Sequence, residues 1–167
     1  MKQCKSRPKS IYKYKRYWFH VSSTLKRKIE FLHPRDNDEG FNRADHEPNV
    51  RRICVSPTLE QCLTAIPYSS HDTIKIYKTR RPIKVKKSVD VFDSFVTGEK
   101  WITNPTKFVK IGVLKFEKIN KYLDTIDPEG KEEGIISESA SQGTERYSQE
   151  VYKWWKKLKP WRFVEPK

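Results

Sequence analysis

Residues 53–67 read ICVSPTLEQCLTAIP and contain the clearest change of pattern in the chain. The first three of them are apolar, which predicts a short strand. From Leu59 the apolar side chains recur three, four and seven positions later, which is the spacing of one helical face, and a proline ends the pattern. Ser56 and Pro57 fit the N-cap and the first position of this helix. A strand followed at once by a helix predicts a fold that mixes α and β structure.

Further strands are predicted on both sides of this unit. Residues 108–119 (FVKIGVLKFEKI) predict the longest strand, with Gly112 as a bulge or kink. Residues 26–32 fit both a helical stripe and the alternation of a strand. Shorter strands are expected, because of their apolar and β-branched content, at residues 17–21, 73–78, 83–85, 89–92 and 98–103. We expect the strand at residues 17–21 to be a central one.

The composition divides the chain into four segments. Residues 1–16 are basic and contain proline, so we expect a flexible arm, and residues 17–123 form the α+β core domain. Residues 124–146 are acidic and rich in Gly and Ser, which predicts a disordered linker. Residues 147–167 predict a Trp- and Lys-rich amphipathic helix that docks on the core. Two alternatives stay open: its aromatic side lies on a membrane surface or partner, or its tryptophans stack on bases.

The charge of the chain favours an anionic partner. There are 35 Lys and Arg against 21 Asp and Glu, which gives a net charge of +14. Residues 1–35 alone hold eleven basic residues and one acidic residue. This distribution attracts polyanions, although a Lys-rich surface also serves solubility alone. The residues expected to contact nucleic acid are Lys13, Lys15, Arg16, Lys153, Lys156, Lys157 and Trp161.

The sequence lacks the motifs of several common enzyme classes. The glycine-rich loops of P-loop NTPases and dinucleotide-binding folds are missing, as are the GxSxG, HExxH and protein-kinase motifs. The three cysteines include no CxxC pair and the histidines have no metal-ligand spacing, so we expect neither a disulfide scaffold nor a metal site. No apolar stretch is long enough to span a bilayer and no signal peptide is evident, so we expect a cytoplasmic protein.

Three polar residues stand at the ends of apolar stretches, in the order His20, Ser56 and Glu99. Their order resembles the ADP-ribosyltransferase superfamily, particularly its branches that act on nucleic acids, such as the DNA-modifying toxins and the RNA 2′-phosphotransferases. The resemblance covers about residues 17–119. It is carried by FHVS (19–22), by ICVSP (53–57) with LEQCL (59–63) after it, and by GEKWI (98–102) leading into VKIGV (109–113).

The resemblance implies a split, mainly antiparallel sheet and NAD as the substrate. The family's histidine holds the adenosine ribose, and a residue of the second motif helps to seat nicotinamide. The family's glutamate bonds the 2′-hydroxyl of the nicotinamide ribose, and such a carboxylate stabilises the positive charge that builds up as the glycosidic bond breaks. Glu99 would be this catalytic residue. The cofactor-binding residues implied in the same way are His20, Val21, Ser22, Arg52 near the pyrophosphate, and Ser56.

We expect the acceptor of the implied reaction to be a nucleic acid or a nucleotide rather than a protein arginine. Position 97 is Thr, so the Glu-x-Glu pair of arginine-modifying members is missing. A non-catalytic basic module that binds nucleic acid or an acidic protein stays an alternative, as does a transferase-like fold without catalysis. Taken singly, His20 also fits a strand-end histidine, Ser56 a helix cap and Glu99 a surface carboxylate in a turn.

Overall fold

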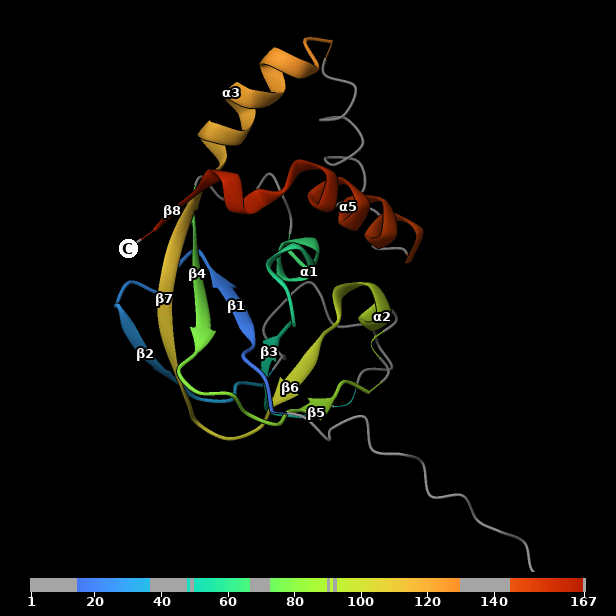
Figure 1. The fold of residues 1–167 in the computed structure, drawn as a ribbon. Coiled ribbons are helices and arrows are strands. Elements are labelled where there is room, and N and C mark those ends of the chain that lie inside the picture. The colour runs from blue at the N-terminus through green and yellow to red at the C-terminus, as the bar shows by residue number, and fades with distance from the viewer. Residues whose placement is uncertain are drawn as a thin grey trace, which may run out of the picture.

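The computed structural model describes residues 15–36, 48, 50–66, 73–89, 91, 93–129 and 145–166. In these ranges the chain forms helices and two sheets in which neighbouring strands run antiparallel (Figure 1). The predicted α+β class with antiparallel sheets is therefore confirmed.

The larger sheet has the strand order β1-β4-β7-β2, and β8 also pairs with β7. Its strands are β1 (Phe19–Ser22), β2 (Ile29–Leu32), β4 (Thr73–Thr79), β7 (Thr106–Lys115) and β8 (Val164–Pro166). Of residues 26–32, whose pattern fitted both a helix and a strand, Ile29–Leu32 form strand β2 because they pair with β7. β1 stands at the end of the order, so the prediction of a central strand is wrong.

The smaller sheet has the strand order β3-β6-β5. Its strands are β3 (Ile53–Val55), β6 (Lys100–Ile102) and β5 (Lys86–Lys87). An isolated backbone bridge joins the two sheets, in which the amide of Phe19 donates to the carbonyl of Ser56 at 2.9 Å and the reverse bond measures 3.0 Å. β1 and β3 therefore meet at this bridge and then belong to different sheets.

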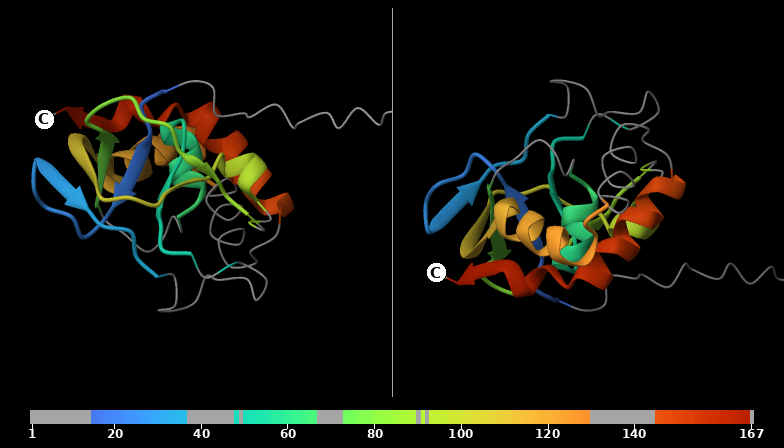
Figure 2. Two further views of the ribbon diagram at one scale, coloured as in Figure 1. Left: turned by 90° about the horizontal axis from the view of Figure 1, so that it is seen from below. Right: turned by 90° about the horizontal axis from the view of Figure 1, so that it is seen from above.

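The helices gather at one end of the two sheets (Figures 1 and 2). They are α1 (Leu59–Thr64), α2 (Ser94–Thr97), α3 (Phe116–Ile126) and α5 (Glu145–Leu158), followed by the short 3-10 helix η2 (Pro160–Phe163). Within the described ranges, none of these helices is long and apolar enough to cross a membrane.

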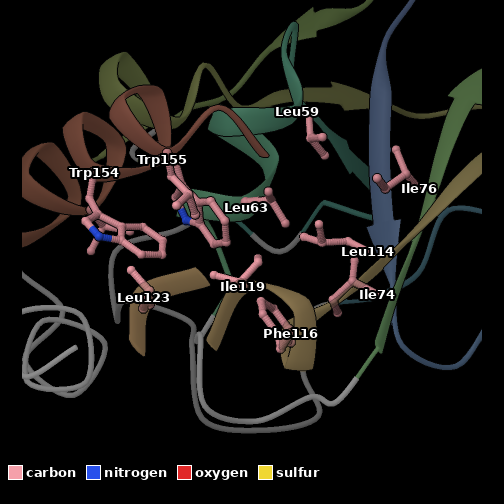
Figure 3. Packing of buried hydrophobic residues seen from close by; sticks show 12 residues of the cluster. Leu59, Leu63, Ile74, Ile76, Leu114, Phe116, Ile119, Leu123, Trp154 and Trp155 are labelled. Carbon is pink, nitrogen blue, oxygen red and sulfur yellow. The ribbon is translucent and has the colours of Figure 1, made fainter. Parts of the chain in front are cut away.

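Two clusters of buried side chains hold these layers together. In the first, α1, α3 and α5 pack on the larger sheet around Leu63, Ile119 and Trp155 (Figure 3). In the second, Tyr77 and Phe108 of the larger sheet pack against side chains of the smaller sheet. The larger sheet is thus covered by helices over part of one face and by the smaller sheet on the other.

The start of α1 differs from the prediction. Thr58, not Ser56, is the N-cap residue, and its hydroxyl oxygen accepts a hydrogen bond from the amide of Gln61 at 3.2 Å. Ser56 is buried, and its backbone is paired with Phe19. The chain leaves this bridge and passes Pro57 before it turns into the helix, so Pro57 also precedes the first helical position.

The long strand predicted to end at residue 119 ends at Lys115, and a helix follows. Phe116, Ile119 and Leu123 lie on one side of α3 and are buried in the first cluster. A register shift occurs where β4 passes Gly112. A Cβ atom on Gly112 would lie 2.3 Å from Cγ1 of Val164, so this glycine permits the close approach of β8.

The terminal segments also differ from the expected boundaries. Arg16, placed in the flexible arm, is bridged by its backbone to Ile83. The expected linker overlaps α3, which reaches Ile126, and α5, which begins at Glu145. Residues 1–14 and 130–144 lie outside the described ranges.

Candidate functional site

The turn before β6 fixes the position of Glu99. Gly98 ends α2 with a φ of +62°, a left-handed conformation that favours glycine. A Cβ atom there would lie 2.6 Å from Nε2 of Gln61 and 2.8 Å from Cδ of Pro57. Nε2 of Gln61 in turn donates to the carbonyl oxygen of Val96 at 3.1 Å. The turn is therefore pressed against the start of α1, and Glu99 follows it directly.

The carboxylate of Glu99 is half-buried and accepts two hydrogen bonds on Oε1. Nε1 of Trp101 donates at 2.7 Å and the thiol of Cys54 donates at 3.4 Å. Burial raises the pKa of Glu99, whereas the donors on Trp101 and Cys54 and the charge of Arg52 act in the opposite direction. The side chain is thus held in one place by neighbours that favour its ionised form.

His20 lies on β1 just after the bridge that joins the sheets. Its Nδ1 is 3.0 Å from the carbonyl oxygen of Cys54. A carbonyl only accepts, so Nδ1 carries the proton, and in the neutral ring Nε2 is left as an acceptor. Burial lowers the pKa of His20, and the charge of Arg35 adds to this effect, although the bond to Cys54 raises it. His20 is therefore neutral at pH 7.

Cys54 connects these two groups. Its carbonyl oxygen accepts from His20 and its thiol donates to Glu99, while Trp101 is its partner across the β3–β6 pair. Desolvation and the charge of Glu99 raise the pKa of Cys54 to about 12. Because Cys54 is solvent-exposed, we attribute the raised pKa of its thiol mainly to the neighbouring carboxylate of Glu99. The thiol stays protonated and acts as a donor, not as a nucleophile.

Arg52 places a buried positive charge beside this cluster. Its guanidinium lies 4.3 Å from the ring centroid of Trp101, and Nη1 donates to the carbonyl oxygen of Pro48 at 3.2 Å. Its backbone is bridged to Arg35. The structure thus positions Arg52 next to Glu99 and Trp101.

The other residues implied as cofactor-binding have structural contacts of their own. Ser56 is buried, and its backbone is paired with that of Phe19. The hydroxyl of Ser22 accepts bonds from the amides of Thr24 and Leu25, which closes the turn after β1. Val21 packs against the first hydrophobic cluster. The structure therefore brings His20, Arg52 and Glu99 together around Cys54, and it surrounds Val21, Ser22 and Ser56 with packing and turn contacts.

The residues expected to contact nucleic acid lie in separate parts of the chain. Lys15 and Arg16 are exposed before β1, and Lys13 is outside the described ranges. Lys153, Lys156 and Lys157 of α5 are exposed. Trp154 and Trp155 are buried in the first cluster, whereas Trp161 is 43% exposed and packs edge-on against Phe19.

Cys54 and Trp101 were not among the residues expected at this site. Their role depends on the pairing of β3 with β6, which joins residues far apart in the sequence. Trp101 stands two positions after Glu99 in the sequence. An indole N–H this close to a candidate carboxylate could have indicated Trp101 as a hydrogen-bond donor to it. Among the described residues, no group of three His, Cys, Asp or Glu side chains is placed to hold a metal ion.

In comparisons with known proteins, no family model, no curated protein and no solved structure matches this chain. The arrangement around Cys54 therefore has to be interpreted from its own geometry.

Proposed function

We propose that this chain binds NAD and transfers ADP-ribose to a nucleic-acid or nucleotide acceptor, with Glu99 as the catalytic carboxylate. The observation that supports this most directly is that Glu99 and His20 contact one residue, Cys54, where the two sheets separate. The contact distances are 3.4 Å from the Cys54 thiol to Glu99 and 3.0 Å from its carbonyl oxygen to His20. Two of the three polar residues expected at the site, His20 and Glu99, thus contact the same residue.

The proposed reaction breaks the bond between nicotinamide and C1 of its ribose. The electron pair of this bond leaves with nicotinamide, and positive charge develops on the ribose. A nucleophilic oxygen or nitrogen of the acceptor then forms the new bond to C1 and releases its proton. The carboxylate of Glu99 stabilises the positive charge and accepts a hydrogen bond from the 2′-hydroxyl of this ribose.

Each neighbour of Glu99 has a task in this scheme. Trp101 and Cys54 hold Oε1 by hydrogen bonds, so the second oxygen, Oε2, can face the ribose. The bonds from Trp101 and Cys54 and the charge of Arg52 favour the ionised carboxylate and oppose part of the rise in pKa that its burial causes. Neutral His20 offers Nε2 as an acceptor for a ribose hydroxyl of the adenosine half.

The test is NAD turnover by the purified chain, followed by the release of nicotinamide. Glu99→Gln keeps the size and the bond from Trp101 but removes the negative charge. Loss of one electrostatic contact of this kind lowers kcat by about 10²–10³-fold. Glu117→Gln is the matched control, because Glu117 is an exposed carboxylate on α3 that pairs with Lys121. Equal turnover by the Glu99→Gln variant and the original chain would refute the proposal, as would no turnover by either with RNA, DNA or nucleotides present.

The pH dependence gives an independent check of the same residue. Burial raises the pKa of Glu99 above its ordinary value of 4.5, so the carboxylate takes up a proton at a higher pH than a free one. The rate is expected to fall as the pH is lowered through this raised pKa. A rate that stays constant down to pH 4.5 contradicts the assigned role.

A further inference from the structure

One part of the larger sheet exposes aromatic and basic side chains together. The exposed fractions are 44% for Tyr17, 53% for Phe31 and 43% for Trp161, and Ile29 is 48% exposed. Ile29 and Phe31 lie on β2, which stands at an edge of the sheet. Large apolar side chains on such an edge promote aggregation unless the edge is masked or used for binding. We call this surface the open sheet face. It consists of Tyr17, Ile29, Phe31, Lys78, Lys107 and Trp161.

The strand register places these residues on one side of the sheet. Phe31 on β2 lies opposite Lys107 on β7, and Ile29 lies opposite Val109. Val109 is in turn the partner of Lys78 on β4. Directly paired residues of antiparallel strands point to the same face, so one surface runs across three strands.

Aromatic contacts extend this surface past β1. Lys78 is the partner of Phe19, and its Nζ lies 4.7 Å from the ring centroid of Tyr17. The ring of Trp161 packs edge-on against Phe19, with centroids 5.8 Å apart. Tyr17 and Trp161 therefore belong to the same side as Lys78.

This surface is distinct from the site around Glu99. Residues that alternate with it, such as Leu32, Tyr77 and Phe108, point to the opposite side and pack against the smaller sheet. His20 lies on that opposite side, with its ring centroid 5.7 Å from that of Phe108. β2 itself lies at the outer edge of the molecule, away from α1 and α2 (Figure 2).

The charge of the open sheet face is positive. Lys78 of β4 and Lys107 of β7 lie on this face, whereas Lys75, Lys110 and Lys115 alternate with them and point to the other side. Glu30, the acidic residue of β2, is paired with Phe108 and also points to that other side. Oε1 of Glu30 accepts bonds from the amides of Lys26 and Arg27 at 3.2 and 2.8 Å, so this carboxylate is engaged in the turn before β2. Lys107 is exposed beside Phe31. An anionic ligand with flat apolar groups is complementary to this combination.

We propose that the open sheet face binds a single-stranded nucleic acid. Aromatic side chains stack on bases regardless of sequence, and lysines between them neutralise phosphates. Phe31, Tyr17 and Trp161 supply the rings, and Lys78 and Lys107 supply the charges. The inference does not rest on chemistry at Glu99.

The residues around Phe31 and Lys78 leave both side chains able to contact one nucleic-acid strand. His33 packs edge-on against Phe31, with centroids 5.1 Å apart and an interplanar angle of 84°, which leaves a face of the Phe31 ring available. β4 and β2 flank β7, and neighbouring strands lie about 4.8 Å apart, so Lys78 and Phe31 are about 10 Å apart across the sheet and, being two residues out of register, about 7 Å apart along it. A short single strand can contact both.

The experiment measures binding of a fluorescein-labelled 12-residue oligothymidylate to the full chain by fluorescence anisotropy, without NAD. Phe31→Leu keeps an apolar side chain but removes the ring, and we expect the affinity to fall about five- to hundredfold. Phe31→Tyr keeps the ring and is expected to bind as the original chain does. Phe31 is exposed, and thermal melting verifies that both variants fold.

Salt titration tests the lysines separately. The slope of log K against log salt is about −0.7 per phosphate contact for a single strand, so Lys107→Gln should make it less steep by about 0.7. Lys121→Gln removes the same charge from α3 and is expected to leave the slope unchanged. Glu99→Gln is expected to bind the oligonucleotide normally, so failure of this inference is distinguished from failure of the proposed catalysis.

Three results would overturn the inference. The first is full affinity in Phe31→Leu, which shows that the oligonucleotide does not stack on the ring of Phe31. The second is equal loss of affinity in Lys107→Gln and Lys121→Gln, which indicates attraction by net charge alone. The third is equal or tighter binding of a 12-base-pair duplex, in which the bases are not open to stacking.

Discussion

Replacement of Gly98 by Ala is the perturbation that connects the fold most closely to the position of Glu99. The residue has a φ of +62°, and the left-handed conformation costs a residue with a Cβ about 1–2 kcal/mol. The new Cβ would lie 2.6 Å from Nε2 of Gln61, so the side chain of Gln61 has to leave its hydrogen bond to Val96. A hydrogen bond of this kind contributes about 0.5–1.5 kcal/mol.

Together these costs amount to about 1.5–3.5 kcal/mol before any displacement of Pro57, whose Cδ would lie 2.8 Å from the same Cβ. For a chain of this length each kcal/mol lowers Tm by about 2–4 °C, so Gly98→Ala should lower Tm by about 3–14 °C. Because Glu99 is the next residue, NAD turnover should fall more than the stability loss alone explains at temperatures where the variant is folded.

A double-mutant cycle separates the two causes. Gln61→Ala removes the side chain that the new Cβ would meet, so Gly98→Ala should cost less in this background by about the energy of the lost hydrogen bond. The assay is chemical denaturation of the four chains. A loss below 0.5 kcal/mol for Gly98→Ala, or an identical loss in both backgrounds, shows that the turn is not packed against α1 as described.

Three further predictions concern the core, the helix start and the pH dependence of stability. Trp155→Ala should destabilise by about 3–5 kcal/mol in denaturant titrations because the side chain is fully buried, whereas Trp161→Ala should cost less than about 1 kcal/mol. Thr58→Ala should cost about 1 kcal/mol as a lost N-cap, and an unchanged denaturation midpoint contradicts the assignment. Burial lowers the pKa of His20, so the unfolded chain takes up the proton at a higher pH than the folded chain, and stability is lost as the pH falls below about 6.5. In thermal melts from pH 8 to pH 5, His20→Asn should remove this part of the loss. The same pH profile in His20→Asn and in the original chain would contradict the prediction.

The elements that local pattern determines were predictable. Alternation along Thr73–Thr79 and the apolar stripe of Leu59, Cys62 and Leu63 identify β4 and α1 without tertiary information. The start of α1 was not predictable in this way. Ser56 followed by proline is typical of a helix N-terminus, but the backbone of Ser56 pairs with Phe19, and that contact joins residues far apart in sequence.

The end of β7 shows a competition between two patterns. Residues 108–119 have high β propensity throughout, which predicts one long strand. Phe116, Ile119 and Leu123 also have helical spacing, and the chain takes the helix because all three side chains are then buried against α5 and the larger sheet. The β propensity of residues 108–119 alone does not include this burial, because burial depends on contacts with distant parts of the chain.

The candidate site was predictable in part for the same reason. His20 and Glu99 could be selected from the sequence because an imidazole and a carboxylate stand beside apolar stretches. The connection through Cys54 depends on the register that sets Cys54 opposite Trp101, and on the isolated bridge between Phe19 and Ser56. Both are consequences of long-range pairing, which a single sequence does not display.

Titration of the chain with NAD by calorimetry tests most directly whether the groups around Cys54 form one nucleotide site. We expect saturable binding at one site, weaker binding in His20→Asn because the imidazole acceptor is lost, and retained binding in Glu99→Gln, which loses turnover instead. Heat changes that never saturate, or equal affinity in the original chain and in His20→Asn, would show that the imidazole and the carboxylate do not serve a common ligand.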